Sequence, residues 1–240
     1  MTTSRMVRWG LAGAAFATSV ATVRDYERWR ALGQGGIPHG AKGWLQVTYL
    51  RTRMRETKDP AVHLPFIGEA GDGRWLTQIP HRDGERPRIG RYPVPHRQVD
   101  QPGSLRARVA VLDHFDARAA GSPGVLGYRL SAFERHNDAI TLLDLDKAPA
   151  ATRMAKGEVA HIHPGDGSMH MILSPSDAVT ALEAGWAERH PLAGMYGEPL
   201  TYLMVYSPRS PEEADVVGQL LDAAVGYATG ASDTTAGQSL

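Results

Sequence analysis

The pattern of hydrophobic and polar positions predicts short strands in succession, followed by helices toward the C-terminus. Short or alternating apolar runs predict strands at 127–136, 139–143, 159–163, 170–173 and 202–206. Apolar residues at helical spacing, each set after a Ser-Pro cap, predict helices at 178–186 and 214–227. Paired strands with helices grouped at one end are typical of an α+β fold. We therefore expect a single domain with an antiparallel sheet flanked by helices, plus an N-terminal helix.

The N-terminal segment, 1–32, is expected to form an apolar or amphipathic helix. Within it, residues 5–23 join two arginines to an Ala-rich apolar run, shorter than the roughly 20 apolar residues of a membrane-spanning helix. We expect this helix to pack on the domain or to contact a membrane peripherally, in a cytoplasmic protein, with a signal peptide as the alternative. The main domain is expected at 33–229, and the Ser-, Thr- and Gly-rich tail at 230–240 is expected to be disordered.

Charge and cysteine content exclude several function classes. The chain of 240 residues has 26 basic and 26 acidic residues, so it lacks the basic face that nucleic-acid binding normally requires. It has no cysteine, which excludes disulfides, thiolate metal sites and cysteine nucleophiles. There is no P-loop and no Gly-rich dinucleotide loop. The candidate chemistry therefore rests on histidines and carboxylates.

Three histidines, His161, His163 and His170, fall within ten residues. Successive side chains of a strand point to opposite faces, so His161 and His163 share one face. If residues 164–168 form the turn of a hairpin, His170 returns opposite that pair on the next strand. Three imidazoles on one face, beside the carboxylate of Glu158, indicate either a metal site or an acid–base site.

Each interpretation gives the neighbouring residues a different role. Three imidazoles and a carboxylate form a ligand set for iron, manganese or zinc in a metal-dependent hydrolase or dioxygenase. In an acid–base site, Glu158 or Asp166 orients an imidazole that deprotonates an enol or phenol. His136 is expected over the same sheet face, and Arg189 with His190 offers charge that steadies an oxyanion. The third interpretation is that the histidines only satisfy buried backbone groups.

Segments in a fixed order along the chain carry a family resemblance. They are 24–26, 74–76, 86–87, 133–136, 158–170, 185–194 and 205–213. In this order they resemble the luciferase-like domain family, whose best-known members are the fungal luciferases that act on 3-hydroxyhispidin. The resemblance covers most of the chain, so 33–229 is expected to be a luciferase-like domain.

The resemblance implies an oxygenase that acts on a small aromatic enol, a hydroxypyrone or polyphenol, with light emission left open. In the fungal luciferases, O2 adds to the hydroxypyrone, and loss of CO2 from an endoperoxide leaves an excited product. The resemblance implies that O2 is the co-substrate and that no metal, flavin or nucleotide is required. It also implies that a histidine of the cluster takes the enol proton while Arg189 or His190 steadies the negative charge.

The same resemblance implies where the substrate binds. The expected substrate-binding residues are Asp166, Trp186, Tyr206, Arg74 and Trp75. Two alternatives stay open. One is a metal bound by His161, His163 and His170, and the other is a non-catalytic relative that binds a small molecule.

Overall fold

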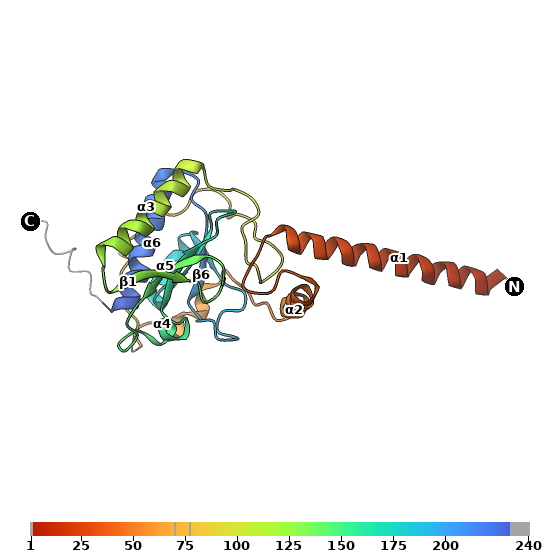
Figure 1. The fold of residues 1–240 in the computed structure, drawn as a ribbon, viewed down its shortest axis with the longest axis horizontal. Coiled ribbons are helices and arrows are strands. Elements are labelled where there is room, and N and C mark those ends of the chain that lie inside the picture. Colours follow the sequence, from red (N-terminus) through yellow and green to blue (C-terminus); the bar gives the residue numbers. More distant parts are fainter. Residues whose placement is uncertain (1, 70, 77, 231–240) are drawn as a thin grey trace, which may run out of the picture.

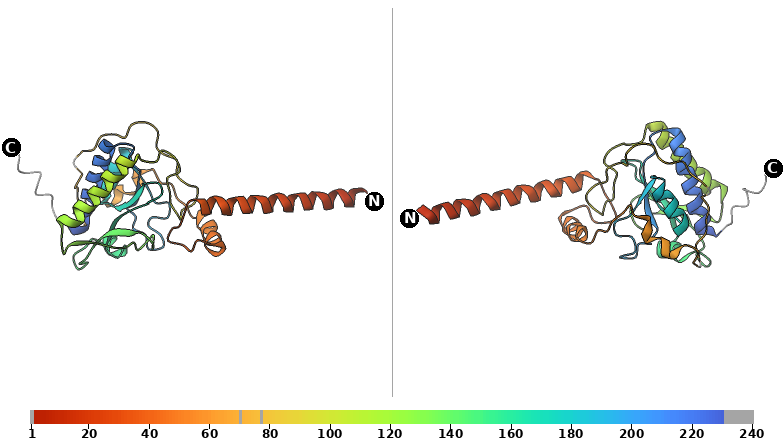
Figure 2. Two further views of the ribbon diagram at one scale, coloured as in Figure 1. Left: turned by 45° about the horizontal axis from the view of Figure 1, so that its top comes forward. Right: turned by 180° about the vertical axis from the view of Figure 1, so that it is seen from behind.

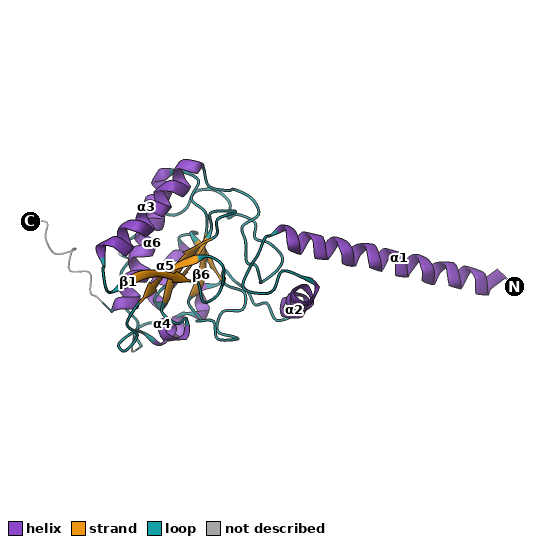
Figure 3. Ribbon diagram, in the orientation of Figure 1, coloured by secondary structure: helices purple, strands orange, loops and turns teal. Residues whose placement is uncertain are grey.

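Six antiparallel strands form the sheet at the centre of the fold (Figures 1 and 3). The structure is a computed structural model that describes residues 2–69, 71–76 and 78–230, except for the side chains of residues 2–16. Within these residues the strands are β1 (Leu126–Leu130), β2 (Asp138–Leu142), β3 (Glu158–Ile162), β4 (Met169–Ile172), β5 (Ala187–Arg189) and β6 (Tyr202–Val205). Their order is β1-β2-β3-β4-β6-β5, and all neighbouring pairs are antiparallel.

Helices cover one face of this sheet. α6 (Pro211–Thr229) lies across β3 and β4, α3 (Leu105–Gly121) runs alongside it, and α5 (Pro175–Glu183) packs near β5 (Figure 2). Ser104, Ser174 and Ser210 cap these three helices by accepting hydrogen bonds from backbone N–H groups of the first turn. The remaining helices are α1 (Thr2–Ala31), α2 (Ala41–Arg51), α4 (Ala150–Met154), η1 (Pro60–Val62) and η2 (Leu64–Phe66). The predicted α+β fold is confirmed.

Side-chain alternation gives the two faces of the sheet opposite character. On β4, Met169 and Met171 pack in the core with α6, whereas His170 points to the other face. On β6, Leu203 and Val205 are the register partners of the two methionines and share their side. We call the covered side the helix face and the opposite side the histidine face.

A β-bulge moves Glu158 onto the histidine face. Ile140 pairs with Ala160 while Thr141 pairs with Glu158, so β3 advances two residues where β2 advances one. In a regular strand, Glu158 and His161 would point to opposite faces because they are three residues apart. The extra residue reverses this relation, and the Glu158 carboxylate reaches His161 Nδ1 at 2.5 Å.

The hairpin that joins β3 to β4 closes around Gly167. His163 N donates to Ser168 O at 2.8 Å, and Gly167 N donates to His163 O at 2.9 Å. Gly167 has a φ of +75°, and a Cβ atom there would lie 2.7 Å from Ser207 Oγ. Only glycine fits this left-handed, crowded position without strain. The turn predicted at 164–168 is thus confirmed.

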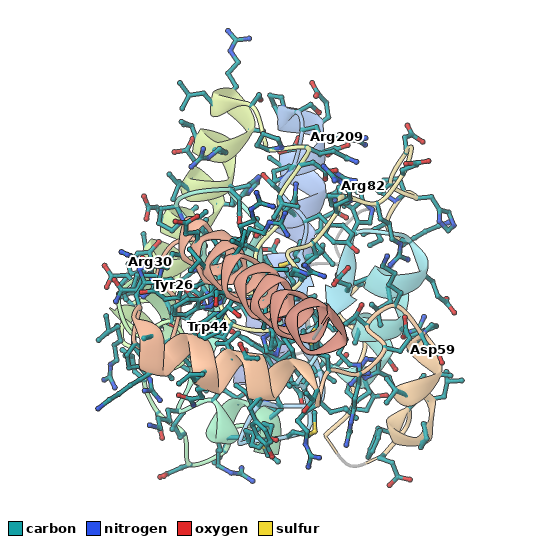
Figure 4. The ribbon with its side chains drawn as sticks, turned by 90° about the vertical axis from the view of Figure 1, so that its right-hand side faces the viewer. Tyr26, Arg30, Trp44, Asp59, Arg82 and Arg209 are labelled. Atoms are coloured by element: carbon teal, nitrogen blue, oxygen red, sulfur yellow. The ribbon has the colours of Figure 1, made fainter. Side chains whose placement is uncertain are left out.

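The N-terminal helix is joined to the domain through its C-terminal part and extends outward from it (Figure 1). Asp25 accepts hydrogen bonds from Trp44 Nε1 (3.0 Å), Arg51 Nη1 (3.1 Å) and Tyr92 OH (2.9 Å). Tyr26 and Trp44 meet edge to face, with ring centres 6.0 Å apart, where α1 lies beside α2 (Figure 4). Among the helices of the described residues, none has both the length and the apolar character needed to cross a membrane.

Some boundaries differ from the predicted ones. The strand predicted at 127–136 ends at Leu130, where the chain turns toward β2. α5 and α6 begin at Pro175 and Pro211, earlier than the apolar spacing indicates, because proline fits the first position of a helix. The sequence does not predict β5, since three residues are too few to show an alternation. The tail predicted at 230–240 lies outside the described residues except for Gly230. The division at residue 32 and the membrane contact of residues 5–23 stay predictions.

Arg189 and His63 lie near each other on the helix side of the sheet, away from the histidine face. Arg189 is the register partner of Leu203, which places its side chain on the opposite side from His170. Its guanidinium donates to Glu56 O. His63 is fully buried, and neither ring nitrogen has a hydrogen-bond partner among the described residues. Burial first, and then the positive charge of Arg189, lower the pKa of His63 to about 4.

Replacing Gly167 by alanine should destabilise the hairpin that holds the histidines. The left-handed φ and the contact with Ser207 predict a loss of about 1–3 kcal/mol in the free energy of unfolding, measured with urea. Gly165 is the matched control, because its φ is not left-handed and a Cβ atom there meets no atom within 4 Å. Gly165→Ala should stay within about 0.5 kcal/mol of wild type. Equal effects of the two substitutions would contradict this account of the turn.

The buried, neutral His63 should make the protein less stable in acid. Unfolding frees its imidazole to bind a proton with a pKa of about 6.5, whereas the folded state resists protonation down to about 4. The contribution is therefore full above about pH 6.5 and is lost as the pH falls toward 4. Between pH 7 and pH 5, wild type should lose about 2 kcal/mol more unfolding free energy than His63→Leu. Identical pH dependence in the two proteins would refute the shift.

Candidate functional site

Five buried imidazoles pack together on the histidine face. His161 and His163 come from β3 and the residue after it, His170 from β4, His190 from the residue after β5, and His96 from the loop before α3. The centres of neighbouring rings are 4.9 to 5.5 Å apart. His161 and His170 are direct register partners. The three histidines that the sequence places on one face do converge there.

The Glu158 carboxylate fixes the orientation of His161. Its Oε1 accepts from His161 Nδ1 at 2.5 Å, while its Oε2 accepts from Ser131 Oγ at 2.9 Å and from Ala132 N at 2.6 Å. Glu158 is only 2% exposed, so these hydrogen bonds replace the water that a buried carboxylate otherwise requires. With Nδ1 as the donor, His161 Nε2 is left with a lone pair.

His163 and His170 are oriented in the same way by other partners. Ser168 Oγ donates to Asp166 Oδ1 at 2.6 Å, so it accepts from His163 Nδ1 at 2.8 Å. His170 Nδ1 donates to Leu203 O at 3.1 Å. In both imidazoles Nε2 is therefore the nitrogen with the lone pair. The Nε2 atoms of His161 and His163 are 3.3 Å apart.

The other two imidazoles are backed by carboxylates. His190 Nε2 donates to Pro93 O at 3.0 Å, and its Nδ1 contacts Glu198 Oε2. His96 Nε2 lies 3.5 Å from Glu188 Oε1. A carboxylate beside an imidazole balances the charge that the ring gains when it takes a proton. These two histidines are therefore suited to acid–base work.

Burial keeps the inner histidines uncharged at neutral pH. Burial first, then the charge of Arg97 and the neighbouring imidazoles, hold the pKa of His163 well below its usual value. Burial and the adjacent imidazoles do the same to the pKa of His170. Burial also lowers the pKa of His96, although Glu188 opposes the shift. Neutral imidazoles offer lone pairs, either to a proton or to a metal ion.

A pocket of about 430 Å³ opens against one side of the cluster. His96, His170 and His190 line it, whereas His161 and His163 are not among its lining residues. Most of the other walls are aromatic or aliphatic, and they include Val94, Phe133, Leu192, Tyr202, Tyr49 and Tyr196. The last two tyrosines are largely exposed and form the rim. A pocket with apolar walls and a few polar groups on one side is typical of a small-molecule site.

The histidines also have the arrangement of metal ligands. Among the described residues there are two sets of three histidines in which one nitrogen of each ring lies within 4.8 Å of a nitrogen of the other two rings. One set is His161, His163 and His170, and the second joins His170 to His96 and His190. Imidazole is a good ligand for first-row transition ions. The site thus has the groups for either of the two chemistries that the sequence indicates.

Two predicted catalytic residues lie outside the cluster. His136 donates from Nδ1 to Glu134 O, is half-buried, and does not line the pocket of the histidine face. Arg189 points to the opposite side of the sheet, because an odd step along β5 separates it from Glu188 and His190. The expected position of Arg189 beside the imidazoles is therefore corrected.

The predicted substrate-binding residues are not brought into the pocket. Asp166 holds Ser168, and Tyr206 OH donates to Glu188 Oε2 at 3.1 Å, so both act on the cluster through a neighbour. Trp186 packs in the core of the helix face, and its Nε1 donates to Pro80 O. Trp75 packs against Tyr227 of α6, and Arg74 is exposed beside it. Packing explains the presence of these residues among the shared motifs at least as well as contact with a substrate does.

The sequence interpretation misses several residues that the fold brings to the site. They are His96, Glu134, Glu188, Glu198 and Tyr202. Tyr202 stacks on His170 with ring centres 4.4 Å apart, and Glu134 binds Arg97 at 2.5 Å. His96 lies in a loop between prolines, where no periodicity indicates the direction of its side chain. Of these residues, only Glu188 could have been found from the sequence. Had β5 been recognised, its alternation would have placed Glu188 on the same face as His190, the residue after the strand.

Comparisons with known proteins show which family the chain is similar to. Residues 156–224 match the luciferase domain family, and this stretch holds Glu158 and four of the five clustered histidines. The luciferase of Armillaria mellea is 32% identical over 243 residues, covering 92% of this chain and 89% of the relative. The luciferase of Neonothopanus nambi is 32% identical over 235 residues, covering 90% of this chain and 86% of the relative. No solved structure matches the chain. The resemblance seen in the sequence is confirmed, and the chain belongs to the luciferase family that includes these fungal proteins.

Proposed function

We propose that this member of the luciferase family oxidises a small aromatic enol, a hydroxypyrone or polyphenol of the 3-hydroxyhispidin type, with O2 as co-substrate. Membership of the family makes the chain an enzyme of the oxidoreductase type. The observation that carries the proposal is the pocket that is lined by three imidazoles together with mostly aromatic and aliphatic side chains. Its volume of about 430 Å³ lies within the range of small-molecule sites.

The walls of the pocket suit a flat, partly apolar ring. Phe133 and Tyr202 pack against each other with ring centres 4.4 Å apart, and Leu192 completes this side. A substrate ring that contacts them leaves water, which favours binding by about 25 cal/mol for each Å² of apolar surface. Its hydroxyl groups can then reach His170 and His190, whose rings lie 4.4 and 5.4 Å from the Tyr202 ring. The pocket thus orients an enol toward proton acceptors.

His190 and Glu198 are the pair that we assign to the enol proton. His190 Nε2 is engaged with Pro93 O, so Nδ1 is the nitrogen that exchanges a proton. This atom contacts Glu198 Oε2, and both residues line the pocket. A carboxylate beside the ring raises its readiness to accept the proton and balances the resulting charge. The imidazolium then stays next to the enolate and steadies it, a role that Arg189 cannot take from the other face.

Deprotonation prepares the substrate for oxygen. The enolate is more electron-rich than the enol, and O2 adds to its carbon skeleton. For a hydroxypyrone, the lactone carbon then leaves with its two oxygens as CO2, and both atoms of O2 stay in the organic product. The buried histidine face keeps bulk water away from this anion and from the peroxide that follows it.

Removal of the His190 side chain should slow turnover strongly. With 3-hydroxyhispidin under air, wild type should consume O2 and release CO2, with light recorded in parallel. His190→Ala should lower kcat by about 10²- to 10⁴-fold, because the loss of a general base has effects of this size. Glu198→Gln should lower it less, since the imidazole remains.

His114→Gln is the matched control. This imidazole lies on α3, pairs with Asp215 on the helix side, and does not line the pocket. The control should keep the wild-type kcat. If wild type binds 3-hydroxyhispidin but leaves it unchanged under air, the protein binds the substrate without catalysis. Wild-type turnover by His190→Ala would eliminate the role assigned to that residue.

A further inference from the structure

Three imidazoles of the cluster each direct Nδ1 to a hydrogen-bond acceptor and are left with a lone pair on the other nitrogen. Each Nδ1 of His161, His163 and His170 donates outward, to Glu158, to Ser168 and to Leu203 O respectively. The nitrogen that each ring has left is Nε2, which carries no hydrogen. A ligand nitrogen of each ring lies within 4.8 Å of the other two.

One proton cannot satisfy this arrangement. A hydrogen between His161 Nε2 and His163 Nε2, which are 3.3 Å apart, would form a hydrogen bond between these two rings. The lone pair of His170 would then have no partner in that bond. A cation at the centre attracts all three at once. Two nitrogen ligands at the zinc distance of about 2.1 Å lie about 3.4 Å apart in a tetrahedral site. The observed distance between His161 Nε2 and His163 Nε2, 3.3 Å, is close to that value.

We propose that the Nε2 atoms of His161, His163 and His170 bind a divalent first-row transition ion. Imidazole ligands favour zinc, iron, cobalt or copper over magnesium and calcium, which prefer oxygen. Three histidines leave a further coordination position open, as in catalytic metal sites. The ion lies between the sheet and the inner wall of the pocket, because His170 lines that pocket and its two partners do not.

The groups behind the ligands support this assignment. A metal-binding histidine characteristically donates its other ring N–H to a carboxylate or a backbone carbonyl, which fixes the ring. Here Glu158 holds His161 directly, and Asp166 holds His163 through Ser168. One carboxylate thus binds a ligand histidine directly, and the second binds another through one serine. Two negative charges near the ligands can balance the charge of a divalent ion. All three imidazoles are at most 2% exposed, so their orientation is fixed by packing as well.

The second set of three histidines fits a metal less well. His190 uses Nε2 to bind Pro93 O, and its Nδ1 already contacts Glu198 and accepts from Leu192 N. His96 directs Nε2 toward Glu188. Both nitrogens of His190 are therefore engaged, and His96 offers only Nδ1, which has no hydrogen-bond partner among the described residues. The two sets divide the cluster into a metal-binding half and a proton-exchanging half, which meet at His170.

Cobalt binding tests the proposal without any substrate. The full chain, free of a polyhistidine tag, is treated with a chelator and titrated with Co²⁺, followed by visible absorption. Wild type should bind one Co²⁺ per chain with the strong absorption of a tetrahedral site, and the ion should raise its unfolding temperature. Metal analysis of untreated protein should find about one transition ion per chain.

Substitutions locate the ion. His163→Gln should abolish stoichiometric Co²⁺ binding and the increase in unfolding temperature. Ser168→Ala keeps all three ligands and removes only the group behind His163, so it should weaken Co²⁺ binding by about 10- to 100-fold. His114→Gln, an imidazole of α3, is the control and should bind as wild type does.

Either of two results would overturn the metal site. One is a folded wild-type chain that binds no Co²⁺ stoichiometrically, and the other is binding that His163→Gln and Ser168→Ala leave unchanged. If His163→Gln fails to fold, Ser168→Ala decides alone, since it alters no ligand. The readout is independent of turnover, so a failure here is distinguishable from a failure of the proposed oxidation.

Discussion

The bulge in β3 is the constraint on which the site depends. A strand presents side chains to two faces only, and a carboxylate three residues from His161 belongs by default on the apolar side. The helix face of this sheet is packed with methionine, leucine and valine, where an unpaired carboxylate would cost several kcal/mol. By adding one residue, β3 turns Glu158 to the histidine face, where it meets His161, Ser131 and Ala132. One irregularity both protects the core and orients the first imidazole.

The rest of the cluster follows the same rule that buried polar groups need partners. Four of the imidazoles have one nitrogen held by a fixed group. Glu158 and Ser168 hold His161 and His163 from the same hairpin, and the carbonyls of Leu203 and Pro93 hold His170 and His190 from distant segments. These contacts determine which nitrogen of each ring carries the hydrogen, and so which lone pairs face inward. The hydrogen-bond partners of each ring, rather than the number of histidines, distinguish the proposed ligand set from the proposed proton-exchanging pair. Preorganised rings of this kind need little rearrangement when a proton, an ion or a substrate arrives.

The site and its pocket come from different parts of the chain. The stretch that matches the luciferase domain, 156–224, carries Glu158 and four histidines on one sheet. The facing walls come largely from earlier segments, among them 36–37, 46–50, 93–96 and 132–135. The N-terminal half, anchored through Asp25 to α2 and Tyr92, therefore contributes part of the pocket wall.

The sequence by itself determined the α+β class, the hairpin of His161, His163 and His170, and the family, because these depend on local periodicity and on the order of motifs. Only the tertiary structure decided that His96 joins the cluster, that Arg189 leaves it, and that Glu158 reaches His161. His96 comes from a loop without periodicity, Arg189 from a strand of three residues, and Glu158 from a bulge. In each case the direction of a side chain is set by a register with a distant strand or loop, and no local pattern carries that information.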